Sequence, residues 1–71
     1  MKEITATMAG TVLEVNVTSG EEVSFGQEVL KIESMKMEIP IESTLGGKVE
    51  EIKVNIGDFV NEGDVLFLIK S

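Results

Sequence analysis

The chain has 71 residues, no cysteine, no histidine and a formal net charge of −7 at pH 7. The missing cysteine excludes disulfides and cysteine-ligated metals, and the missing histidine excludes the usual general base and every Ser/His/Asp or Cys/His nucleophilic arrangement. The acidic balance argues against nucleic acid and anionic membrane as partners.

The composition also predicts one small soluble domain over residues 1–71, because 42% of the residues are hydrophobic and 27% are charged. The first ten residues, MKEITATMAG, contain no apolar region of the kind that a signal peptide needs. No apolar run approaches the length of a membrane span. We therefore expect a cytoplasmic protein, and we expect it to be a monomer.

Strand patterns appear almost everywhere along the chain, and no helical stripe competes with them. In chain order, the segments that read as strands are 11–17, 28–33, 47–54 and 63–70, which are rich in β-branched residues or alternate apolar with charged residues. Glycines separate these segments as turn residues should: Gly20, Gly26, Gly57 and Gly63. The fold class predicted from this pattern is all-β.

An internal repeat divides the chain. Aligned against itself with an offset of 37 positions, the sequence gives 11 identities over 34 pairs without a gap. The halves are residues 1–34 and 38–71, and the tripeptide Met35-Lys36-Met37 lies between them. Neither half is large enough to close a core, so we expect the two to pack together as one quasi-symmetric β structure.

The centre of the sequence predicts a β-hairpin with a two-residue turn at Met35-Lys36. This placement makes apolar pairs alternate with polar pairs, as a hairpin with one buried face requires. Pro40 lies in the returning strand, and its missing N–H suggests an edge or irregular position. The expected cross-strand pairs are Ser34 with Met37, Glu33 with Glu38, Ile32 with Ile39, and Leu30 with Ile41.

The turn residues conflict with local preference. Two-residue hairpin turns favour Asn-Gly or Asp-Gly, because both central residues need positive φ. Glu33 opposite Glu38 places like charges across the ladder, and Met35 and Met37 are large apolar residues at a loop tip. Taken singly, a tip lysine is usually only a solvated turn residue, and a methionine is usually core filler. Their conjunction around Lys36, at the centre of a repeat, indicates a functional constraint.

These residues resemble a known family. Glu33-Ser34-Met35-Lys36-Met37-Glu38 is similar to the E-A-M-K-M-E signature of biotinyl domains, the carrier modules of biotin-dependent carboxylases and decarboxylases. Residues 6–10, A-T-M-A-G, resemble the A-P-M-x-G motif of that family, and the G-x-x-V pattern recurs at 57–60. The resemblance covers the whole chain, and it is closest to small stand-alone bacterial biotin/lipoyl attachment proteins.

The resemblance implies a flattened β-barrel, or barrel-sandwich hybrid, of two four-stranded antiparallel sheets with pseudo-twofold symmetry. It implies that a biotin protein ligase attaches biotin to Lys36, with Met35 and Met37 as flanking recognition residues and with Glu33, Ser34 and Glu38 as the hairpin context. The carrier then visits a biotin carboxylase and a carboxyltransferase. It has no catalytic residues and no metal of its own.

The sequence departs from the family pattern at a few places: Thr7 stands for Pro, Ser34 for Ala, and Ser43-Thr44 for Ala-Pro. The gapless repeat also leaves no room for the thumb loop of many bacterial acetyl-CoA carboxylase carriers. That absence makes the chain more similar to the carriers of pyruvate, propionyl-CoA or decarboxylase systems.

Three other interpretations stay open at this stage. A lipoyl domain, modified with lipoate by a lipoyl ligase, shares the fold and the hairpin lysine, and Glu33 meets its requirement for a Glu three residues before the lysine. The flanking methionines favour biotin over lipoate. An enzyme could use paired carboxylates such as Asp58 and Glu62, but the chain offers no nucleophile or phosphate loop. A plain adaptor that carries nothing would not need the M-K-M tip.

Overall fold

The computed structural model describes residues 1–70, and these residues form eight β-strands. No helix within this range is long and apolar enough to cross a membrane. The strands are β1 (Lys2–Thr5), β2 (Gly10–Val15), β3 (Glu22–Val23), β4 (Glu28–Ser34), β5 (Met37–Glu42), β6 (Gly47–Ile52), β7 (Phe59–Val60) and β8 (Val65–Lys70).

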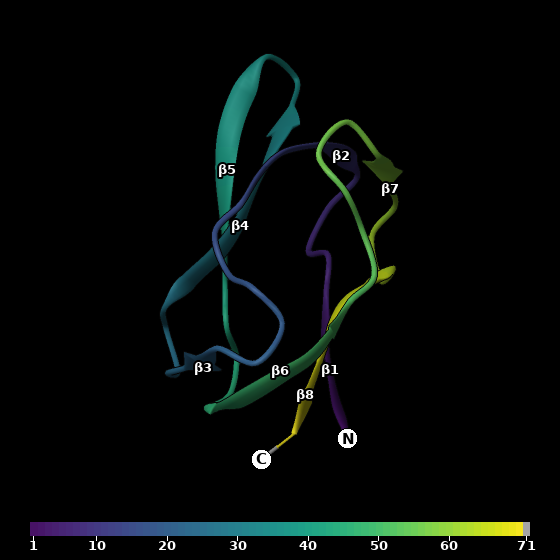
Figure 1. Ribbon diagram of the computed structural model, residues 1–71. Helices are drawn as coiled ribbons and strands as arrows, with labels where there is room; N and C mark the ends of the chain where they lie inside the picture. The colour runs from purple at the N-terminus through teal and green to yellow at the C-terminus, as the bar shows by residue number, and fades with distance from the viewer. Residues whose placement is uncertain (71) are drawn as a thin grey trace.

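The strands form two four-stranded antiparallel sheets that face each other as a flattened barrel. One sheet has the order β1-β8-β6-β3, and the other has the order β5-β4-β2-β7. The molecule measures 33 × 19 × 18 Å along its principal axes. Figure 1 shows the turn of the β4–β5 hairpin at one end of the molecule and both termini at the other. The predicted all-β, two-sheet architecture is confirmed.

The two sheets are related by a pseudo-twofold axis. Adding 37 to the residue numbers converts β1, β2, β3 and β4 into β5, β6, β7 and β8, and it converts one sheet order into the other. Hydrogen bonds outside the ladders obey the same rule. The N–H of Gly20 donates to the carbonyl of Val49 at 2.8 Å, and the N–H of Gly57 donates to that of Val12 at 2.8 Å.

The core repeats in the same way, and each half contributes one member of every buried pair. Burying this apolar surface between the sheets supplies the main driving force for folding, which neither half achieves alone. The pairs, 37 residues apart, are Ile4/Ile41, Ala6/Ser43, Val12/Val49, Val17/Val54, Val23/Val60, Val29/Leu66, Leu30/Phe67 and Ile32/Ile69.

Ser43 is the polar member of this set. It is 2% exposed, and it stands where the repeat has Ala6. Its hydroxyl donates to the carbonyl of Leu45 and accepts from the Leu45 N–H at 3.4 Å. Because both hydrogen-bonding functions of the hydroxyl have local partners, the core accommodates serine at this position without an unsatisfied group.

The predicted strands were correct in type but too long at some ends. The segments 11–17 and 47–54 leave the ladder at Val15 and Ile52, although Val17 and Val54 further along remain buried. The chain crosses there from one sheet to the other, so the apolar pattern outlasts the hydrogen-bonded strand. The segment 63–70 enters its strand only at Val65, after the turn. The two-residue strands β3 and β7 are too short to produce a periodic signal.

Candidate functional site

The β4–β5 hairpin has the predicted register throughout. Ser34 pairs with Met37, Glu33 with Glu38, Ile32 with Ile39, and Leu30 with Ile41. The strand β5 lies at the edge of its sheet, which is where the proline in the returning strand was expected. The turn therefore falls on Met35-Lys36, at the end of the molecule.

Both turn residues have left-handed backbone conformations. Met35 has φ 53° and Lys36 has φ 64°, and no other residue of the described chain apart from glycine has positive φ. Positive φ at both central positions is the requirement of a type I′ turn. Residues other than glycine pay about 1–3 kcal/mol each for this conformation. The turn is thus strained, and Lys36 sits on it.

The tip projects its side chains into solvent. Met35 is 89% exposed and Met37 is 62% exposed, and Lys36 is exposed between them. Glu33 and Glu38 are exposed one pair below the tip, and Ser34 is half-buried. Among residues 1–70, the ion pairs involve Lys31 and Lys53 and leave the Lys36 amine free. The Lys36 side chain is therefore accessible to solvent.

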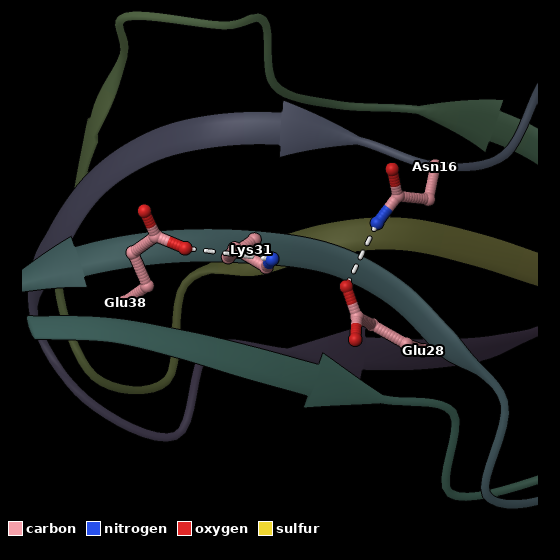
Figure 2. A network of polar contacts seen from close by, with 4 residues as sticks. All are labelled: Asn16, Glu28, Lys31 and Glu38. Atoms are coloured by element: carbon pink, nitrogen blue, oxygen red, sulfur yellow. Dashed lines mark hydrogen bonds and ion pairs between the residues drawn. The ribbon is translucent and has the colours of Figure 1, made fainter.

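Two polar contacts hold β4 to its neighbours below the tip (Figure 2). Lys31 Nζ lies 3.5 Å from Glu38 Oε1, diagonally across the hairpin. On the other edge, the Asn16 amide donates to Glu28 Oε2 at 3.0 Å. The ion pair offsets the repulsion predicted between Glu33 and Glu38. Because it is partly exposed, it contributes at most about 1 kcal/mol.

The same ion pair makes the amines of the two hairpin lysines differ in their availability to a partner. The Lys31 side chain is only 25% exposed, and its amine is engaged by a carboxylate. Lys36, five residues later, has neither restriction. The hairpin thus offers one of its two amines to a partner.

Gly10 supports the hairpin from the neighbouring strand. A Cβ added at this position would lie 2.5 Å from the backbone carbonyl oxygen of Glu33. Only glycine lets β2 approach β4 this closely. In the sequence, Gly10 appeared as part of the repeat and of the A-T-M-A-G motif, but nothing there identified the backbone that it contacts.

The two carboxylates considered for acid/base chemistry, Asp58 and Glu62, do not form a catalytic pair in the structure. Asp58 Oδ2 accepts a hydrogen bond from the Asn55 N–H at 2.9 Å and so closes its own turn. Glu21, at the equivalent position of the first half, does the same for Thr18 at 3.0 Å. Glu62 is exposed. Within residues 1–70 there is no pocket and no cluster of acidic residues suited to a metal ion.

A duplicated flattened barrel that presents one free lysine on a strained hairpin defines a carrier-domain architecture. Residues 2–69 match the biotin/lipoyl family model, which is described as "Biotin-requiring enzyme". The chain belongs to this family, and its relatives include a protein of Solanum lycopersicum that is named as a carrier, the biotin carboxyl carrier protein of acetyl-CoA carboxylase.

Individual relatives agree with this assignment. The chain is 56% identical over 59 residues to the biotin/lipoyl attachment protein of Bacillus subtilis (strain 168), covering 83% of this chain and 81% of the relative. It is 35% identical over 68 residues to the biotinylated protein TB7.3 homolog of Mycobacterium leprae (strain TN), covering 96% of each.

A solved structure extends the comparison to a carboxylase. The urea carboxylase of Kluyveromyces lactis matches with a TM-score of 0.90 and 30% identity. The match covers 97% of this chain and 6% of that enzyme. The fold of nearly the whole chain therefore occurs as a small part of that urea carboxylase.

The strained turn predicts that replacing both of its residues makes the chain more stable. Replacing Met35-Lys36 by Asn-Gly should raise the free energy of unfolding by about 1 kcal/mol or more, because both residues tolerate positive φ. Urea denaturation measures the change. The control is Lys48→Gly, an exposed position in β6 without positive φ, which should lose about 0.5–1 kcal/mol. An Asn-Gly variant no more stable than the original chain would show that the turn is unstrained.

Proposed function

We propose that this chain is a biotin carboxyl carrier, biotinylated on Lys36 by a biotin protein ligase. The observation that carries the proposal is the presentation of this one lysine: of six lysines, only Lys36 lies in a hairpin turn. The flanking residues fit the role. Met35 and Met37 supply flexible apolar contacts for the ligase, and Glu33, Ser34 and Glu38 form the hairpin beneath them.

Attachment requires an amide bond between Lys36 Nζ and the carboxyl carbon of biotin. If the ligase activates that carboxyl group as an adenylate, the bond to AMP breaks as the amide forms, and the lysine ammonium group loses two of its three protons. The chain contains no histidine, and no ion pair of the described residues involves Lys36. We therefore assign the base that accepts these protons to the ligase. The contribution of this chain is to hold the amine in solvent, away from competing partners.

The carried group fits the surroundings of the tip. Biotin, when bound, supplies a ring nitrogen that accepts and releases a carboxyl group. The long, flexible lysine stem extends the reach of this ring, while the barrel keeps the base of the arm fixed. Such an arm suits transfer between a biotin carboxylase and a carboxyltransferase. We propose these enzymes as partners, in a cytoplasmic setting.

Intact-mass spectrometry tests the attachment site. After co-expression with a biotin ligase, the protein should gain the mass of one biotinyl group, and Lys36→Arg should abolish the gain. The matched controls are Lys31→Arg, which removes the other hairpin lysine, and Lys48→Arg, which removes an exposed strand lysine. Both controls should keep full occupancy. An adduct that survives Lys36→Arg, or that maps to Lys31, Lys48 or Lys53, would refute the assignment.

A second cofactor is supported by one finding. The Bacillus subtilis relative is named for both biotin and lipoyl attachment. In this chain Glu33 also stands three residues before the lysine, as the lipoyl pattern requires. We propose lipoate on the same lysine as the alternative cargo, attached by a lipoyl ligase.

The flanking methionines should decide between these cargoes. Met35→Asp combined with Met37→Ala converts the tip to the lipoyl-type Asp-Lys-Ala, and it should lower biotin occupancy and raise lipoyl occupancy. Competition between the two purified ligases, read out by intact mass, measures the ratio. Phe25→Ala, an exposed apolar residue of the β3–β4 turn, serves as the control and should change nothing. An unchanged ratio in the double variant would place recognition elsewhere on the barrel.

A further inference from the structure

Two exposed apolar residues lie one strand away from the lysine hairpin, on the far side of β2. Neither belongs to the buried core. Phe59 in β7 is 65% exposed, and Ile56 in the loop before it is 68% exposed. Phe59 pairs with Thr11, and Thr11 pairs with Glu33 of the hairpin. Directly paired residues point to the same face of a sheet, so Phe59 shares the outer face with Glu33. Two strand spacings, about 10 Å, separate these positions.

The loop that carries Ile56 is fixed at the same end of the molecule. The Gly57 N–H donates to the Val12 carbonyl at 2.8 Å, and the Val12 N–H donates to the Asp58 carbonyl at 2.8 Å. Figure 1 shows this β6–β7 loop at the hairpin end of the barrel, away from the termini. Ile56 and Phe59 therefore have a defined position relative to Lys36.

The repeat shows that the fold does not need apolar side chains at these positions. The equivalents of Ile56 and Phe59 in the first half are Ser19 and Glu22, which are both exposed. The backbone environments match, because β3 occupies the place of β7 in the other sheet. Apolar residues occupy these positions only in the copy at the hairpin end of the molecule.

The hairpin end of the molecule also carries exposed acidic side chains. Acidic residues lie around the tip and the adjacent loop, and the lysines near the termini, Lys2, Lys48 and Lys70, have acids such as Glu3 and Glu22 beside them. Lys31 and Lys53 are each paired with a glutamate. The acids of the hairpin end are Glu33, Glu38, Asp58 and Glu62.

We propose that Ile56 and Phe59, with the acids around them, form a docking surface for the ligase that modifies Lys36. This inference rests on the proposed function. We expect the matching surface of the ligase to carry an apolar patch surrounded by lysine or arginine, complementary to the surface of this chain. Docking on this surface fixes the orientation in which the tip enters the active site.

The reach of Lys36 favours the ligase over the later enzymes. The ligase must bring its catalytic centre to Nζ itself, so its footprint is centred on the tip. A standard interface buries about 800 Å² on each partner, a disc of roughly 16 Å radius. On a surface of 4277 Å², this is about a fifth of the molecule, and it reaches β7. Enzymes that act on the ring at the far end of the modified arm need no such contact.

Exchanging residues between the two halves tests the surface with minimal disturbance of the fold. The variant Ile56→Ser with Phe59→Glu installs the residues of the first half. The control is Phe25→Glu, in which a phenylalanine that is more exposed than Phe59, at the opposite end of the molecule, takes the residue of its equivalent, Glu62. Initial rates of biotinylation by purified ligase with ATP and biotin are followed by intact mass over a range of carrier concentrations.

We expect the double variant to raise KM and lower kcat/KM about tenfold or more, as the loss of an interface hot spot does. Phe25→Glu should stay within about twofold of the original chain, a change below hot-spot size. Added NaCl should raise the KM of the original chain, since opposite charges steer the encounter. If the double variant proves unfolded by urea denaturation, Phe59→Glu alone replaces it.

Several results would overturn the inference. One is an unchanged kcat/KM in a folded variant, and another is a loss confined to kcat. A third is self-association of the original chain that the double variant abolishes, which would make the surface an interface between copies. A defect seen only in carboxylation would assign the surface to the carboxylase. The complete absence of a biotin adduct on the original chain would instead contradict the proposed function.

Discussion

The pairing of Leu30 with Ile41 and of Ile32 with Ile39 places the turn of the central hairpin at Met35-Lys36. Leu30, Ile32 and Ile41 are at most 2% exposed, and fully burying each such side chain contributes about 1.5–3 kcal/mol. A slip of one residue would turn all of them toward solvent. This loss exceeds the cost of about 1–3 kcal/mol for each left-handed turn residue. The packing of the core therefore holds Met35 and Lys36 in a turn conformation that these residue types disfavour.

The duplicated architecture gives this turn its position in space. Each strand of the first half has an equivalent 37 residues later, and the buried residues pair in the same way. The tripeptide 35–37 lies outside that correspondence, at the join of the two copies. Figure 1 places the join and the termini at opposite ends of the barrel. A rigid body below a free tip is the arrangement that a carrier needs in order to meet several enzymes in turn.

The hairpin and its register could be predicted from the sequence because they rest on local alternation of apolar and polar residues. The turn glycines were also predicted correctly: Gly20, Gly26, Gly57 and Gly63 all have positive φ in the structure. The ends of the strands were harder to predict from the sequence, because Val17 and Val54 stay buried after the ladder stops. Apolar burial and strand pairing end at different residues, and the sequence pattern reports only burial.

The surroundings of the tip depended on contacts between distant segments. The Lys31–Glu38 ion pair is a diagonal contact across the hairpin, whereas the predicted register names only directly opposite pairs. The closeness of Phe59 to Glu33 requires two successive strand pairings, β7 with β2 and β2 with β4. No signal local to residues 55–60 could have revealed it. The repeat does show that these two positions are unusual, because Phe59 and Ile56 align with Glu22 and Ser19 of the first half.

The central claim is that the fold, and not the motif alone, presents Lys36 for modification. It is tested by comparing ligase-catalysed biotinylation of the whole chain with that of a synthetic peptide spanning residues 28–42, which contains the motif and both hairpin strands. An isolated hairpin is only marginally stable in water, so a small fraction of the peptide has the competent shape. We predict a kcat/KM for the whole chain at least about tenfold higher than for the peptide. Equal values would show that the ligase reads the six-residue motif without the barrel, and they would contradict this account.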